Sequence, residues 1–105
     1  MTDTNVTDLP EKRQFKLKPA FLKTIQTLFP SLTVQEVTVL YYLASGFDIP
    51  TIARLLRISD STAKTYLLRT KKKLRLDSTI ELKIAYSSRL NQLLITSKIK
   101  GANHV

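Results

Sequence analysis

Cysteine, tryptophan and histidine are almost absent from this chain of 105 residues. It contains no cysteine and no tryptophan, and its one histidine, His104, is the second-last residue. The lack of cysteine excludes disulfide bonds, thiolate nucleophiles and cysteine-ligated zinc or iron–sulfur centres. With a single histidine in a terminal position, we predict no catalytic triad, no metal site and no cofactor. The sequence therefore predicts a protein that is not an enzyme.

Glycine, proline and long apolar runs are also scarce. Two glycines and four prolines leave little room for the many tight turns of a β-sandwich, so the composition favours helices. The longest unbroken apolar run, residues 39–44, is far too short to span a membrane. Residues 1–13 have no apolar segment like that of a secretory signal. These features predict a soluble, cytoplasmic protein with no membrane partner.

Positive charge is concentrated in one part of the chain. Residues 54–75 hold eight of the 17 Lys and Arg residues and only one acid, Asp60, so this segment accounts for seven of the nine net positive charges. Basic residues spread evenly would indicate only solubility or loose affinity for polyanions. Their concentration on one segment is typical of a surface that contacts nucleic-acid phosphates.

The pattern of caps and apolar spacings divides the chain into a leader and five helices. Residues 1–14 are polar and aperiodic, which is typical of a flexible leader. An N-terminal helix is expected within residues 15–31, beginning at Pro19 and carrying apolar residues three and four positions apart. The capping-box pair Thr33 and Glu36 predicts a second helix from Val34. Gly46 is expected to end it in a left-handed conformation.

Three further helices follow. Asp48 is a suitable N-cap for a short helix that ends at Leu56, and Ser59 for a longer helix to about Leu74. Ser78, with Glu81 three residues later, predicts the start of a long C-terminal helix that ends at Gly101. The expected fold is all-α: a small helical bundle containing a helix-turn-helix, with an extra N-terminal helix and a long C-terminal helix.

The fourth predicted helix has two different faces. Ala63, Tyr66, Leu67, Thr70 and Leu74 share one face, whereas the basic residues lie largely outside it. The preceding short helix is joined to it by the tight turn 57–59, and Ile52, Ala53 and Leu56 are expected to brace it. A braced helix with a basic outer face is the arrangement that places side chains in the major groove of DNA.

The segment from Leu32 to about Leu82 resembles the LuxR-type (GerE/NarL-like) helix-turn-helix domain of bacterial transcription regulators. The spacing holds without a gap over about half of the chain. The matching residues are Leu32, Thr33, Glu36, Val39, Leu40, Leu43, Ala44, Gly46, Ile52, Ala53, Leu56, Ser59, Thr62, Lys64, Lys73, Leu74 and Glu81. We expect residues 32–100 to form this domain together with a C-terminal dimerisation helix.

This resemblance implies roles for individual residues. Lys64, Thr65 and Leu68 fall where the family presents side chains to bases, and Leu68 offers apolar contact to a thymine methyl. Phosphate contacts are implied for Ser59, Thr62, Arg69 and Lys72, and the exposed hydroxyl of Ser61 and the charge of Lys71 extend this set. The family's last helix commonly forms a homodimer, which implies an interface at Ile80, Ile84, Leu90 and Leu94.

The chain departs from the usual family pattern at four positions of the helix-turn-helix. Ala63 replaces a usual valine and Tyr66 a usual histidine. Thr70 occupies a position that is normally apolar, and Arg75 stands where a glycine usually follows the Lys-Leu pair. We expect Tyr66 to pack in the core rather than to stack on a base, because its spacing matches that of Ala63 and Thr70.

The sequence therefore favours a DNA-binding transcription regulator that reads double-stranded DNA as a homodimer. The alternative is a protein-interaction module that regulates transcription by binding another regulator or RNA polymerase instead of reading DNA. A third reading is a module resembling the promoter-reading end of a sigma factor. The role of the N-terminal helix is left open between covering the core, extending the dimer and docking a partner.

Overall fold

The computed structural model describes the backbone of residues 17–103 and the side chains of residues 17–97. The predicted leader, residues 1–14, and His104 lie outside the described residues. The described part contains five helices and no strand, so the predicted all-α class is confirmed. The helices are α2 (Pro19–Leu28), α3 (Val34–Ala44), α4 (Ile49–Leu56), α5 (Asp60–Leu74) and α6 (Thr79–Asn103).

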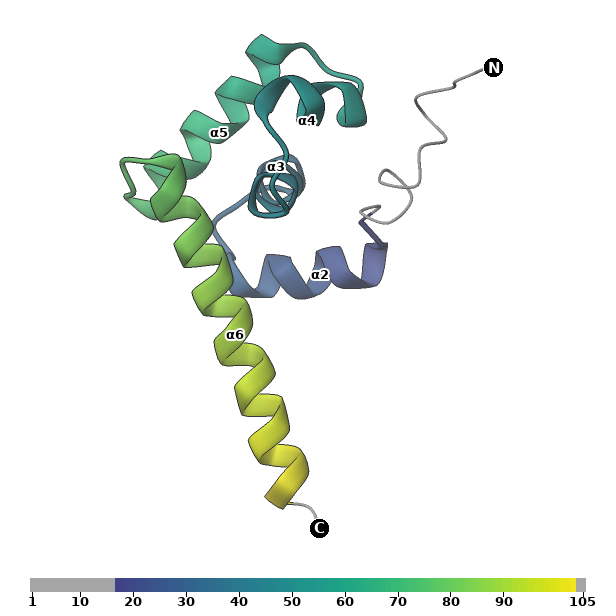
Figure 1. Ribbon diagram of the computed structural model, residues 1–105, viewed down its shortest axis with the longest axis vertical. Coiled ribbons are helices and arrows are strands. Elements are labelled where there is room, and N and C mark those ends of the chain that lie inside the picture. Colours follow the sequence, from purple (N-terminus) through teal and green to yellow (C-terminus); the bar gives the residue numbers. More distant parts are fainter. Residues whose placement is uncertain (1–16, 104–105) are drawn as a thin grey trace.

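Helix α3 lies in the middle of the bundle (Figure 1). It packs against α2, α4, α5 and α6, which explains why its apolar residues are buried on several sides rather than along one stripe. The core that surrounds it combines residues of all the neighbouring elements. Its buried members include Ile25, Phe29, Leu32, Val37, Val39, Leu40, Tyr42, Leu43, Ile52, Leu82 and Tyr86.

The predicted caps are present and set where the helices begin. The Thr33 hydroxyl accepts from the Glu36 N–H, while a Glu36 carboxylate oxygen accepts from the Thr33 N–H at 2.8 Å. Asp48 accepts from the Thr51 N–H at 3.0 Å. Such caps satisfy N–H groups that have no partner within the helix. The predicted capping box of α6, Ser78 with Glu81, also forms in both directions.

Three residues with positive φ lie at the end of a helix or just after it. Gly46, directly after α3 and its C-cap, has φ 102°, as the sequence predicted. Arg57 closes α4 with φ 57° and ψ 46°, and Arg75 closes α5 with φ 57° and ψ 44°. For a residue with a Cβ this left-handed conformation costs about 1–2 kcal/mol. The left-handed geometry at Arg75 explains why glycine is the usual residue there in the family that the sequence resembles.

Helix α6 continues beyond its predicted end. Gly101 was expected to terminate it, but the helix runs through Gly101 to Asn103. Glycine in a helix is unfavourable by about 1 kcal/mol relative to alanine, which weakens a helix but does not by itself end it. A helix stops at glycine when the chain turns there, and α6 makes no such turn (Figure 1).

An ion pair between a buried carboxylate and a partly exposed lysine joins the first turn of α3 to the end of α5. The Glu36 side chain is 2% exposed, and its Oε1 accepts a hydrogen bond from Lys73 Nζ at 2.7 Å. Burial alone would raise the pKa of Glu36, but the Lys73 ammonium and the Thr33 N–H outweigh it and hold the pKa below its ordinary value of 4.5. Because the carboxylate form is favoured in the folded chain, this pair contributes stability above pH 4.5 and loses it as the pH falls through the lowered pKa.

We predict that Glu36→Gln lowers the free energy of unfolding by about 1.5–3 kcal/mol, the usual contribution of a hydrogen bond to a charged group. The amide keeps the size of the side chain but leaves Lys73 without its counter-charge. Urea unfolding at pH 7 measures the loss. The same titration at pH 4 should show a smaller difference between the two proteins, since the carboxylate of the unfolded wild-type chain begins to protonate below its ordinary pKa of 4.5.

Lys72→Met is the matched control, because Lys72 is the exposed neighbour of Lys73 but is not its partner in the ion pair with Glu36. It should leave the free energy of unfolding within about 0.5 kcal/mol of wild type, whereas Lys73→Met should destabilise the chain. Equal effects of the two lysine substitutions would show that the ion pair contributes nothing specific.

Candidate nucleic-acid interface

Helices α4 and α5 and the turn 57–59 form a helix-turn-helix. Helix α4 packs against α5, and both pack against α3. Ile52 and Ala53 of α4 are buried, as is Ala63 of α5, so small and branched side chains meet where the two helices contact. The predicted brace is therefore present, and it leaves one side of α5 away from the rest of the protein.

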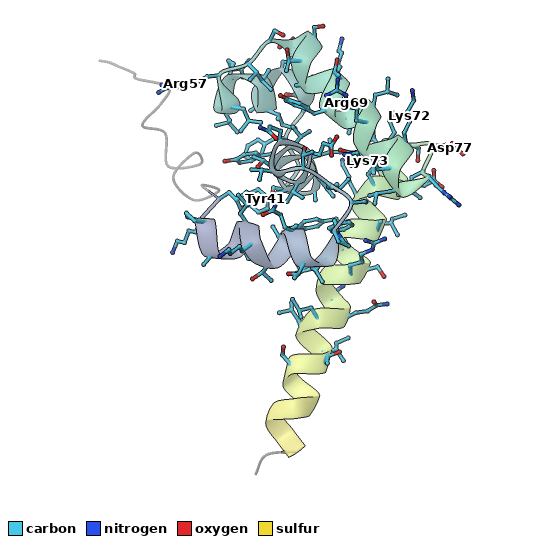
Figure 2. The ribbon with its side chains drawn as sticks, turned by 180° about the vertical axis from the view of Figure 1, so that it is seen from behind. Tyr41, Arg57, Arg69, Lys72, Lys73 and Asp77 are labelled. Carbon is cyan, nitrogen blue, oxygen red and sulfur yellow. The ribbon has the colours of Figure 1, made fainter. Side chains whose placement is uncertain are left out.

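The two faces of α5 separate as the sequence predicted. Ala63 and Thr70 are buried on the inner face, and Tyr66, Leu67 and Leu74 pack against the core around them. On the outer face Lys64, Thr65, Leu68, Arg69 and Lys72 are exposed, and Lys71 is half-buried beside them. Arg69 and Lys72 follow one another along α5 in Figure 2.

Thr70 shows how a polar residue fits the inner face. Its side chain is 1% exposed, and its hydroxyl donates to the Tyr66 carbonyl one turn earlier at 2.8 Å. A buried hydroxyl with a backbone acceptor avoids the cost of an unpaired polar group. The departure from an apolar residue at this position is therefore accommodated inside the helix.

The hydroxyl groups at the start of α5 are partly engaged with one another. Ser59 Oγ accepts from the Thr62 N–H at 3.0 Å and donates to Thr62 Oγ1 at 2.9 Å. The Thr65 hydroxyl donates to the Ser61 carbonyl at 3.0 Å. Ser59 thus serves as the N-cap, and together these bonds fix the first turns of the helix. Hydroxyl oxygens have two lone pairs as well as one proton, so the same groups can still accept a further hydrogen bond.

An open hollow lies on the outer face of the first three turns of α5. It is lined by Asp60, Ser61, Lys64, Thr65 and Leu68. Leu68 is 51% exposed and adds an apolar surface to the polar groups of Lys64 and Thr65. This mixture of apolar and polar groups matches the edges of base pairs in a major groove, which present methyl groups as well as donors and acceptors.

One cation of the basic segment is not part of this surface. Lys73 neutralises the buried Glu36, and its position on the α3 side of α5 can be followed in Figure 2. The sequence contains a signal for this placement, because Lys73 lies three residues after Thr70 on the inner-face spacing. The spacing does not identify Glu36 as the partner, so the ion pair itself was not predicted.

A second missed residue holds α6 to α2. Arg89 Nη1 donates to the Leu28 carbonyl at 2.7 Å, and its guanidinium carbon lies 4.5 Å from the centre of the Phe29 ring. Phe29 in turn stacks with Tyr86, with ring centres 6.3 Å apart. The Arg89 guanidinium satisfies the Leu28 carbonyl at the end of α2, where a positive charge is favoured. Burial raises the pKa of the Tyr86 hydroxyl to about 12.

The four residues predicted for the dimer interface differ in burial. Ile80, Ile84 and Leu94 are 69%, 62% and 52% exposed. Leu90 lies one turn before Leu94, but it is half-buried and packs against the core of its own chain. The first three side chains are therefore accessible to a partner, whereas Leu90 is largely occupied within its own chain.

The family model of GerE, described as bacterial regulatory proteins of the luxR family, matches residues 30–85. The match covers more than half of the 105 residues. The chain belongs to the LuxR family of bacterial regulatory proteins. Its helix-turn-helix is accordingly a DNA-binding module of transcription regulation. No curated protein and no solved structure matches the chain.

The matched region contains α3, α4, α5 and the start of α6, so α2 and the rest of α6 lie outside it. None of the helices in the described part is long and apolar enough to cross a membrane. Within the same residues, no group of three or more potential metal ligands is found.

Proposed function

We propose that this LuxR-family protein is a sequence-specific regulator that binds double-stranded DNA as a homodimer in the bacterial cytoplasm. The observation that carries the proposal is the exposed basic face of α5, which is braced from behind by α3 and α4. A rigid helix with exposed Lys, Arg, Thr and Leu side chains is suited to enter a major groove. Binding near a promoter would place the protein beside RNA polymerase, its expected partner.

The outer residues of α5 divide into two roles in this proposal. Lys64, Thr65 and Leu68 line the open hollow and contact base edges. Phosphates are contacted by residues around them, through charge or through hydroxyl groups of the first turn that donate their O–H to a phosphate oxygen. These are Ser59, Ser61, Thr62, Arg69, Lys71 and Lys72.

The proposed homodimer uses an exposed side of α6 that combines three apolar residues with two polar ones. Ile80, Ile84, Ser87, Asn91 and Leu94 are all exposed, and their spacing alternates between four and three residues. This is the spacing of a helix seam that meets a second helix. Residues 32–100 then form one unit for DNA binding and dimerisation, with the helix within 15–31 packed on its side.

Base readout is tested by comparing Lys64→Ala with Lys72→Ala. We expect Lys64→Ala to weaken binding to the preferred site by about 1–3 kcal/mol while changing binding to random duplex much less. Lys72→Ala should weaken binding to all duplexes equally, because phosphates carry no sequence. The preferred site is first selected from random DNA fragments, and fluorescence anisotropy then measures both affinities. If Lys64→Ala loses the same affinity for both duplexes, Lys64 does not contact base edges.

The same titrations, repeated over a range of salt concentrations, test whether the protein binds DNA at all. With five to eight phosphates neutralised, the slope of log affinity against log salt should be about −5 to −7. A protein-interaction module that does not read DNA would show neither this slope nor a preferred site.

Contact between Leu68 and a thymine methyl can be tested by changing only the DNA. Replacing thymine with uracil at the contacted position removes one methyl group, so we expect wild-type affinity to fall by about 0.8 kcal/mol, or about fourfold. Leu68→Ala should bind the two duplexes equally, since its side chain no longer reaches the methyl. If Leu68→Ala shows the same loss as wild type, the methyl is sensed by another residue.

Dimerisation through α6 is tested by Ile84→Asp, which introduces a charge into the proposed apolar seam. We expect a monomer in sedimentation experiments and weaker binding to paired half-sites. Thr96→Asp is the control, because Thr96 is exposed on α6 and lies on the side that faces α2. If the Thr96→Asp control is a monomer, or if Ile84→Asp remains a dimer, the dimer interface is not this seam.

A further inference from the structure

The two non-glycine residues with positive φ in the described part of the chain are both arginines. Arg57 closes α4 and Arg75 closes α5, each with φ 57°. Both side chains are exposed. The two helices of the helix-turn-helix thus end in the same way, on a residue type with a Cβ and a long cationic side chain, where glycine would adopt the backbone conformation without strain.

The side chains of these two arginines do not stabilise the described part of the fold through polar contacts. Among the residues that the structure describes, neither guanidinium forms a hydrogen bond or an ion pair with another side chain. Two other cations behave differently, since Lys73 is bound by Glu36 and Arg89 by the Leu28 carbonyl. A strained backbone conformation persists where another requirement outweighs it, and such residues cluster at functional sites.

The position of the arginines suggests what that requirement is. Arg57 is the first residue of the turn 57–59 that leads into α5, and Arg75 follows the last residue of α5, so they flank the helix at its two ends. A helix of 15 residues is about 22 Å long, so its two ends lie outside the stretch that carries Lys64, Thr65 and Leu68, the residues proposed to contact base edges. Side chains that flank such a stretch are placed to meet phosphates rather than bases.

Each end of α5 also carries an acid. Asp60 is the first residue of the helix, and Asp77 lies two residues after Arg75. In Figure 2 Arg57 and Asp77 are on opposite sides of the upper part of the molecule. These carboxylates would repel phosphates, and a guanidinium within three residues of each offsets that repulsion.

We propose that Arg57 and Arg75 are phosphate clamps that hold the two DNA strands on either side of the groove entered by α5. The inference rests on the proposed DNA-binding function and adds two contacts beyond the outer face of α5. Guanidinium groups suit this role because they bind phosphate oxygens in pairs and are always charged.

The test replaces each arginine with glycine in the full chain and measures two properties. Relief of the left-handed strain should raise the thermal midpoint by about 2–6 °C per site. Loss of a phosphate contact should make the salt slope less negative by about 0.9 per site and weaken binding to specific and random duplexes by the same factor. A variant that is more stable yet binds more weakly cannot owe its weaker binding to unfolding.

Two further variants separate local contact from overall charge. Lys23→Gln removes one exposed positive charge from α2, so it should leave the salt slope of binding unchanged. Arg75→Lys keeps the charge and the strain, and should retain most of the wild-type slope. If the glycine variants gain stability but keep the wild-type slope, or if Lys23→Gln lowers the slope as much as they do, the clamps are contradicted.

The wild-type chain distinguishes this inference from the function on which it rests. Absence of salt-dependent duplex binding by wild type would contradict the proposed function and the clamps together. Normal wild-type binding, with a slope unchanged in Arg57→Gly and Arg75→Gly, would overturn the clamps alone.

Discussion

The direction in which the outer face of α5 points depends on how its inner face is held against α3. Ala63 and Thr70 bring the helix close to its neighbours, and the Glu36–Lys73 ion pair fixes its C-terminal end. Leu68 and Lys72 are each two residues from Thr70, which places them on the opposite side of the helix, so fixing Thr70 inward turns these two side chains outward. The presentation of a DNA-binding surface is thus a consequence of packing on the opposite side.

Local features of the fold could be predicted from the sequence, because each depends on residues a few positions apart. Thr33 with Glu36, Asp48 and Ser59 mark helix starts through hydrogen bonds to their own first turns. Long-range features could not be predicted in this way. Glu36 and Lys73 are 37 residues apart, and Arg89 is 61 residues from Leu28. Only the folded arrangement of α2, α3, α5 and α6 shows that these residues meet.

Helical periodicity predicted the exposed residues of α5 better than those of α6. Helical periodicity placed the outer residues of α5 correctly, since its inner face contacts one region of the core. For α6 the apolar residues point in several directions, and periodicity alone did not separate Leu90, which packs inside, from Ile80 and Ile84. The left-handed backbone of Arg57 and Arg75 could not be predicted from the arginines themselves, because glycine is the residue type that favours this conformation. Only the family's usual glycine at the position of Arg75 pointed to it.

The most direct test of this account is to map the backbone and side-chain NMR signals that change when a selected duplex is added. We predict the largest changes at Lys64, Thr65 and Leu68, and little change at the buried Ala63 or on α2. Large changes confined to α2 or to the far end of α6, with α5 unaffected, would contradict the account.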